Sequence, residues 1–279
     1  MDWSIAQKEL ASSLVPLYGE REAAVIADWV LESLSGATKL DRLMMRGELL
    51  AAGQLGIYER YRRELLAHRP VQYVLGESWF AGMKFFVDER VLIPRPETEE
   101  LVEWAGSTLS GPVLDVGTGS GCIAVTLARR LPDVVVSACD VSAGALAVAG
   151  KNAKELGAEV RLLELDFLDR RSWAALPPIR WLVSNPPYIP GGERGTMASH
   201  VVDYEPDMAL FVPGDDALVF YRLLGEFARE RMEPDGGLFA EVHEDRGPAV
   251  RDLLLGLGAQ EVQLRNDLQG KDRMIKATW

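Results

Sequence analysis

The second part of the chain alternates short apolar runs with amphipathic segments, and this alternation restricts the fold more than any other feature. It predicts strands at 113–116, 134–139, 159–163, 180–184, 237–242, 260–264 and 273–278. Helices are predicted between them at about 121–130, 142–156, 216–231 and 246–256. Such alternation is typical of a doubly wound α/β fold with a mostly parallel sheet. Ligands of these folds bind where the strand order reverses, at the carboxyl ends of the strands.

The first part of the chain has a different pattern. Apolar side chains recur at helical spacing as far as residue 75, with glycines between the runs, so a small helical bundle is expected. Residues 71–76 and 85–87 flank turn residues such as Gly82, which predicts a β-hairpin linker. The expected domains are therefore a helical substrate-docking domain at 1–75, a linker at 76–92 and a larger domain at 93–279.

A basic patch marks the last helix of the predicted bundle. It consists of Arg60, Arg62, Arg63, His68 and Arg69. A solvated helix face is the favoured interpretation, and a docking face for an acidic or nucleic-acid-bearing partner is the alternative.

Charge and composition exclude several classes of protein. The formal net charge is −12, which argues against binding of nucleic acid mainly through phosphate neutralisation. No apolar run approaches the roughly 20 residues of a membrane span, and the N-terminus lacks the pattern of a signal peptide. Cys122 and Cys139 have neither metal-ligand spacing nor a disulfide framework. We therefore expect a cytoplasmic protein with no metal and no membrane partner, and a monomer by default.

A glycine-rich turn joins the strand at 113–116 to the following helix. Its residues are Gly117, Thr118, Gly119, Ser120 and Gly121. The dinucleotide fingerprint G-x-G-x-x-G does not match, because the third glycine comes one residue early and Cys122 occupies its place. The P-loop pattern fails because no lysine follows. The G-x-G-x-G form after an acidic strand residue is similar to S-adenosylmethionine-dependent methyltransferases. By that resemblance Asp115 and the loop hold the methionine end of the cofactor.

The next two strands end in acidic residues that suit a nucleoside. Asp140 follows the second strand, where a carboxylate can accept hydrogen bonds from both ribose hydroxyls. A role as N-cap of the next helix is the weaker alternative, because Ser142 can serve as that cap. Asp166 and Phe167 follow the third strand. The resemblance to methyltransferases implies that Asp166 reaches the adenine amino group and that Phe167 covers the ring.

The fourth strand runs into Ser184-Asn185-Pro186-Pro187-Tyr188. The prolines forbid further strand pairing and hold the turn extended, so the Asn185 side chain projects from the strand end. A plain proline turn is the structural alternative. If the first half of the sheet is ordered 3-2-1, the fourth strand lies beside the first, and Asn185 should face the methyl group of a cofactor at 117–121. Asn185 is therefore counted with both the cofactor and the substrate residues.

Over nearly its whole length the chain resembles the release factor glutamine methyltransferases (the PrmC/HemK family). The matching stretches lie at 92–99, 114–124, 184–190, 204–206 and 267–273. The Asn-Pro-Pro-Tyr turn alone is not specific, because enzymes that methylate DNA adenine share it. The Ile-Pro-Arg-Pro-Glu-Thr-Glu stretch at 93–99 is more discriminating.

The resemblance implies a fold, a cofactor and a reaction. The fold is a Rossmann-like class I methyltransferase domain with a seven-stranded sheet, an N-terminal helical bundle and a β-hairpin linker. The cofactor is S-adenosyl-L-methionine, which leaves as S-adenosyl-L-homocysteine. The reaction methylates the side-chain nitrogen (N5) of the glutamine in the Gly-Gly-Gln motif of peptide-chain release factors 1 and 2.

The same resemblance assigns substrate roles to the proline turn. The Asn185 side-chain oxygen and the Pro186 carbonyl accept the N–H groups of the target amide, and Tyr188 packs on its flat face. Pro187 and Arg95 are further candidates for substrate contact. Arg95 stands between two prolines, and a structural capping role for it is the alternative.

Two other functions remain open. A nucleic-acid amino-methyltransferase, acting on adenine N6 or guanine N2, would use the same turn, but the net charge and the small helical domain argue against it. A catalytically silent domain that binds release factor or ribosome is the second. The intact glycine loop, Asp140 and Asn185 argue against that function.

Overall fold

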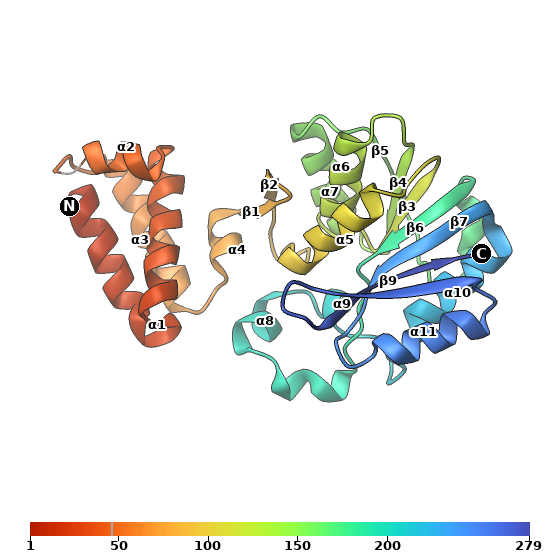
Figure 1. The fold of residues 1–279 in the computed structure, drawn as a ribbon. Coiled ribbons are helices and arrows are strands. Elements are labelled where there is room, and N and C mark those ends of the chain that lie inside the picture. The colour runs from red at the N-terminus through yellow and green to blue at the C-terminus, as the bar shows by residue number, and fades with distance from the viewer. Residues whose placement is uncertain (46) are drawn as a thin grey trace. The chain divides into compact units, whose positions relative to one another are not determined.

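The computed structural model describes residues 1–45 and 47–279. The chain divides into two compact units (Figure 1). The first comprises Met1–Glu77 with Ser199–Tyr204, and the second comprises Ser78–Ala198 with Glu205–Trp279.

The first unit is helical, as the apolar spacing predicts. Its helices are α1 (Trp3–Ser35), α2 (Lys39–Met44), α3 (Ala52–Leu66), α4 (Val71–Leu75) and the short α8 (Ser199–Tyr204). Gly19, with φ 75°, divides α1 into two helical segments, because this backbone conformation does not fit inside a helix. Leu10, Val30 and Tyr58 are fully buried in one apolar cluster between the helices. The predicted N-terminal helical bundle is therefore confirmed.

The prediction of a strand at 71–76 is wrong. Val71–Leu75 forms α4, which follows Pro70 and ends at Gly76 in the left-handed conformation. The β-branched and aromatic side chains favoured a strand, but a preceding proline and a following glycine are helix boundary signals. The hairpin lies further along, in β1 (Glu77–Phe80) and β2 (Met83–Phe86). Its turn residues Ala81 and Gly82 both have positive φ, as a two-residue hairpin turn requires.

Three arginines of the basic patch form ion pairs within their own unit. Arg60 pairs with Glu64, Arg62 pairs with Glu59, and Arg69 also pairs with Glu64. Such exposed pairs contribute little to stability. They agree with the solvated-face interpretation of this helix.

The second unit is built on a seven-stranded sheet ordered β5-β4-β3-β6-β7-β9-β8. The β9 strand runs antiparallel to both β7 and β8, and the other strand pairs of this sheet are parallel, so the predicted mostly parallel sheet is confirmed. The strands are β3 (Val113–Val116), β4 (Val136–Asp140), β5 (Val160–Glu164), β6 (Ile179–Ser184), β7 (Met232–Glu241), β8 (Glu261–Asn266) and β9 (Asp272–Thr278).

The start of β7 differs most from the prediction, at Met232 instead of residue 237. Gly236 and Gly237 both lie inside the strand. A Cβ on Gly236 would come within 2.0 Å of the Arg180 carbonyl oxygen. Glycine at this position therefore permits the backbone of β7 to approach that of β6 closely.

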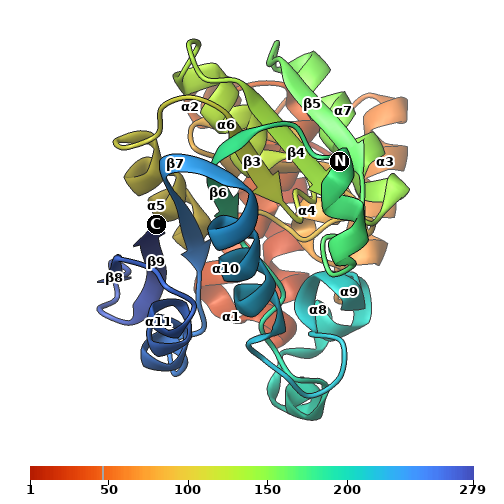
Figure 2. The same ribbon diagram turned by 90° about the vertical axis from the view of Figure 1, so that its right-hand side faces the viewer.

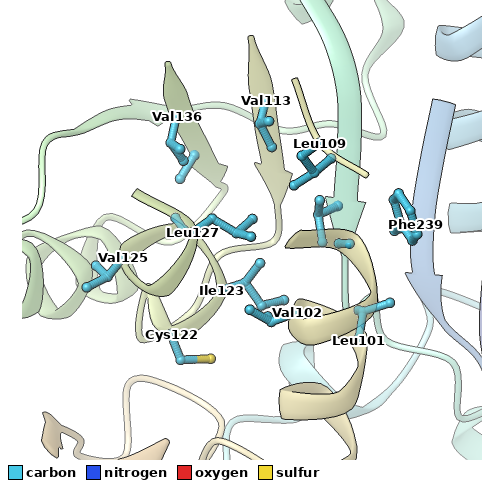
Figure 3. Close-up of a cluster of buried hydrophobic side chains, with 14 of the residues drawn as sticks. Leu101, Val102, Leu109, Val113, Cys122, Ile123, Val125, Leu127, Val136 and Phe239 are labelled. Carbon is cyan, nitrogen blue, oxygen red and sulfur yellow. The ribbon is translucent and has the colours of Figure 1, made fainter. Parts of the chain in front are cut away.

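Helices cover both faces of the sheet (Figures 1 and 2). One layer contains α5 (Pro96–Gly106), α6 (Cys122–Arg130) and α7 (Ala143–Glu155), and the other contains α10 (Val219–Arg231) and α11 (Gly247–Gly256). Val113 belongs to the first apolar layer, with Val102 and Ile123 (Figure 3), and the next residue, Leu114, belongs to the second. This alternation follows from the two-residue period of a strand.

Shorter elements complete the unit. They are α9 (Asp207–Leu210) and two 3₁₀ turns at Arg170–Ala175 and Gly191–Thr196. Within residues 1–45 and 47–279, no helix combines the length and the apolarity of a membrane span.

Candidate active site

The carboxyl ends of three adjacent strands bring the predicted site residues to one edge of the sheet. In the register, Val116 of β3 lies between Cys139 of β4 and Ser184 of β6. The glycine loop after β3, Asp140 at the end of β4 and Asn185 after β6 are therefore neighbours. The predicted order of the first four strands is confirmed, and this edge is the switch point of the sheet.

A cavity lies at this switch point. Many of the predicted site residues line it: Arg95, Gly117, Thr118, Gly119, Ser120, Asp140, Asp166, Phe167, Asn185 and Pro187. Of the remaining predicted residues, Asp115, Gly121, Pro186 and Tyr188 are not in that lining.

Asp115 lies buried behind the glycine loop. Its Oδ2 accepts hydrogen bonds from the Thr118 hydroxyl at 2.6 Å and the Ala124 backbone N–H at 3.3 Å. Its Oδ1 is buried and has no hydrogen-bond partner among residues 1–45 and 47–279. Burial raises the pKa of Asp115 to about 7. An unsatisfied buried carboxylate oxygen favours a cationic or N–H donor ligand, such as the amino group of a methionine moiety.

The first two glycines leave room for that ligand. Gly117 and Gly119 line the cavity with φ of 72° and 54°. A Cβ on either would meet no other atom within 4 Å, so a side chain there would project into free space. The chain around the loop thus fits the methionine end of S-adenosylmethionine.

The third glycine has a packing role instead. Gly121 precedes α6 with φ 80°. A Cβ at this position would lie 3.1 Å from the Ala149 Cβ of α7. Gly121 therefore allows α7 to pack closely against the loop.

Replacement of Gly121 by alanine is expected to lower the free energy of unfolding by about 2–4 kcal/mol, because strained φ and overpacking add. Urea unfolding followed by circular dichroism measures it. Gly106→Ala is the matched control, because its Cβ would meet nothing within 4 Å at a helical position. A Gly121→Ala variant as stable as the control would contradict the packing role.

Asp140 connects the loop to the next helix. Its Oδ2 accepts from the Gly119 N–H and its Oδ1 from the Ser142 N–H, both at 2.9 Å. Burial raises its pKa. Ser142 is the N-cap of α7 and accepts from the Ala145 N–H. The cap is thus supplied by Ser142, and the Asp140 carboxylate lines the cavity with lone pairs left for ribose hydroxyls.

Asp166 and Phe167 occupy the same cavity wall but differ in environment. Asp166 is exposed, and its Oδ1 accepts from the Leu168 N–H at 2.9 Å. Phe167 is 4% exposed, and its ring packs on Trp173 and Phe227 with ring centroids 5.5 Å apart in each pair. The ring is therefore also part of the core beneath the cavity.

Asn185 bonds to Thr98, which in turn bonds to Glu241, and the sequence predicted neither residue for the site. The Asn185 Nδ2 donates to the Thr98 Oγ1 at 3.1 Å, and the Thr98 hydroxyl donates to the Glu241 Oε2 at 2.7 Å. Because Nδ2 is engaged, Oδ1 is the polar atom of the amide that remains for a ligand. Two features of the sequence could have indicated these residues. Thr98 lies in the Ile-Pro-Arg-Pro-Glu-Thr-Glu stretch at 93–99, and Glu241 lies near the end of a predicted strand.

Tyr188 is directed at this network. Its hydroxyl donates to the Glu241 Oε1 at 3.3 Å, and its ring lies edge-on to His243. Burial and the Glu241 charge raise the pKa of Tyr188. The residue therefore contributes a hydrogen bond that the sequence did not predict.

Arg95 pairs with a buried partner. Its Nη2 lies 2.5 Å from the Glu205 Oε1, and the Glu205 Oε2 accepts from the Ile93 N–H at 3.2 Å. The Glu205 side chain is 1% exposed and that of Arg95 is 34% exposed. The pair holds the 93–95 segment along the cavity while Arg95 stays accessible to a ligand.

Asn152 of α7 also supports the site without being predicted. Its Nδ2 donates to the Ser120 and Phe86 carbonyl oxygens at 2.8 and 2.9 Å, and its Oδ1 accepts from the Phe86 N–H. One buried amide thus links the glycine loop to the hairpin. The sequence feature that could have indicated Asn152 is a polar residue on the apolar face of the helix predicted at 142–156.

Comparisons with known proteins agree with this arrangement. The family model of the methyltransferase small domain matches residues 96–247, and that of the PrmC N-terminal domain matches residues 6–76. A release factor glutamine methyltransferase of Flavobacterium psychrophilum is 36% identical over 278 residues, covering 97% of both chains. One of Chlorobaculum tepidum is 40% identical over 286 residues, covering 97% of this chain and 96% of the relative.

Solved structures share the fold. A methyltransferase from Pyrococcus furiosus has a TM-score of 0.52 at 16% identity, covering 77% of this chain and 96% of that one. A 16S rRNA methyltransferase of T. Thermophilus has a TM-score of 0.51 at 17% identity, covering 72% of this chain and 49% of that one. The second unit has the class I S-adenosylmethionine-dependent methyltransferase fold, and the chain belongs to the release factor glutamine methyltransferase family.

Proposed function

We propose that this enzyme transfers a methyl group from S-adenosyl-L-methionine to the side-chain nitrogen (N5) of the glutamine in the Gly-Gly-Gln motif of release factors 1 and 2. The observation that carries the proposal is the orientation of Asn185. Its Nδ2 is engaged by Thr98, so its Oδ1 is available in the cavity beside the glycine loop. An acceptor at this place suits an amide N–H donor.

The cofactor is proposed to lie along the loop and the two acidic strand ends. Asp115 and residues 117–121 hold the methionine end, with Gly121 acting through packing. Asp140 accepts from the ribose hydroxyls, and Asp166 and Phe167 face the adenine. When bound, the cofactor supplies an activated methyl group on a sulfonium, and S-adenosyl-L-homocysteine is the product.

The chain's own task is to place a weak nucleophile. An amide nitrogen reacts poorly because its lone pair is delocalised into the carbonyl group. The Asn185 Oδ1 and the Pro186 carbonyl oxygen accept its two N–H bonds, which orients the nitrogen and favours the positive charge that develops there. Pro187 and Arg95 line the path to this position. No metal ion is part of the proposal.

The helical unit is proposed to dock the release factor. The proposed functional division is docking at 1–75, a linker at 76–92 and catalysis at 93–279. A monomer is proposed as the working form. The free thiols of Cys122 and Cys139 agree with action in the cytoplasm.

Transfer of a radiolabelled methyl group tests the function. Purified release factor, the same factor with its motif glutamine replaced by alanine, and duplex DNA are offered in parallel. We expect label on the first substrate alone. Label on DNA would favour a nucleic-acid amino-methyltransferase, and cofactor binding without any transfer would favour the silent binding domain.

A further inference from the structure

The side chains of Thr98 and Glu241 connect to Asn185 across the end of the sheet. Ser184 of β6 is paired with Ala240 of β7, so Asn185 and Glu241 are the next residues of two parallel neighbours. The first turn of α5 brings Thr98 between them. Thr98 and Glu241 are each 2% exposed, and both are therefore shielded from competing water.

The direction of each hydrogen bond follows from the groups present. The ionised carboxylate of Glu241 only accepts, so the single hydroxyl proton of Thr98 then goes to the Glu241 Oε2 at 2.7 Å. The lone pairs of Oγ1 then accept from the Asn185 Nδ2 at 3.1 Å. Tyr188 donates to the other carboxylate oxygen at 3.3 Å, so Glu241 is held on both sides.

We infer that Thr98 and Glu241 are positioning residues, which hold the Asn185 amide with its oxygen toward the target nitrogen. The inference rests on the proposed function. A flipped amide would present Nδ2, an N–H donor, to the N–H groups of the substrate, and donors repel one another. Neither side chain needs to contact the reacting atoms, since Thr98 acts through Asn185 and Glu241 acts through Thr98.

Thr98→Val tests the link directly, because valine keeps the volume and removes the hydroxyl. We expect kcat to fall about tenfold or more, because one orienting hydrogen bond of a catalytic group is lost. The KM for release factor and the dissociation constant for S-adenosylmethionine should stay within about threefold. Thr98→Ser restores the hydroxyl and should recover most of the turnover.

Thr126→Val is the matched control. Thr126 of α6 is also fully buried, but its hydroxyl has no hydrogen-bond partner in the described part of the chain. This variant should keep the wild-type kcat. Wild-type turnover in Thr98→Val, or an equal loss in Thr98→Ser, would overturn the inference.

A second measurement separates this inference from the proposed function. The side-chain amide signals of Asn185 are identified in a ¹⁵N–¹H spectrum by their absence in Asn185→Ala. They should shift in Thr98→Val and stay in place in Thr126→Val. If wild type transfers no methyl group, the proposed function fails, and this spectrum alone decides whether Thr98 holds the amide. Unshifted signals in Thr98→Val would refute the link whatever the activity.

Discussion

Replacement of Asn185 by alanine is expected to lower kcat for release factor methylation by about 10²–10³-fold. Alanine removes the Asn185 Oδ1, the amide atom that the hydrogen bond to Thr98 leaves available in the cavity. The dissociation constant for S-adenosylmethionine should stay within about threefold, because the proposed cofactor contacts come from the loop and from the ends of β4 and β5. Single-turnover methyl transfer and isothermal titration calorimetry measure the two quantities separately.

Asn266→Ala is the control for this loss. The Asn266 side chain donates to the Gly270 carbonyl in an exposed turn after β8, away from the cavity lining. Removal of the Asn266 side chain should leave kcat unchanged. If Asn185→Ala turns over at the wild-type rate, the assigned role is wrong. An equal loss of cofactor affinity would instead make Asn185 mainly a cofactor ligand.

The parts of the site that are local in sequence could be predicted. A glycine loop between a strand and a helix, or an asparagine before two prolines, has its geometry determined by its own residues. Strand alternation then predicted that the loop and Asn185 would meet at one edge. The sheet order with β3 beside β6 confirms that step.

Other parts depend on contacts that no local pattern encodes. Thr98 and Glu241 are 143 positions apart, and nothing at either position predicts their hydrogen bond. Residues 71–76 have strand-forming side chains, but the preceding proline and the following glycine favour a helical turn. Tyr188 was expected to pack on a substrate amide, and in the structure its hydroxyl is directed at Glu241. Side-chain direction depends on tertiary neighbours, which is why motif position alone did not predict it.

Glu241 is expected to reduce stability at high pH. Burial raises its pKa from 4.5 to about 7. The other groups that influence its charge or share its surroundings are Glu97, Cys122, Tyr188, Tyr221 and Arg273. The folded protein keeps the Glu241 proton that the unfolded chain releases as the pH rises above about 4.5. The stabilisation from this group is therefore complete below pH 4.5 and is lost as the pH rises through about 7. The total loss in the free energy of unfolding is about 3 kcal/mol.

Glu241→Gln should remove this dependence. Glutamine can still accept from Thr98 through Oε1, but it carries no charge to bury. The wild-type unfolding free energy should fall by about 2.5 kcal/mol from pH 5 to pH 8 through Glu241, and this fall should be absent in the variant. The variant should therefore be the more stable protein at pH 8. Urea unfolding of the cofactor-free protein at both pH values measures it. Glu261→Gln, at an exposed position in β8, is the control and should leave the difference unchanged.

The same variant separates stability from function. The carboxylate of Glu241 only accepts, so it leaves the Thr98 lone pairs free for Asn185, whereas a glutamine that rotates would donate to Thr98 and compete. We therefore expect Glu241→Gln to lower kcat at pH 8 by about tenfold while it raises stability there, a trade-off found where active sites hold buried charge. A purely structural role predicts that stability and kcat fall together. A variant that loses stability at pH 8 would show that the buried carboxylate is a net stabilising group, and the sign of the pH dependence argued here would be reversed.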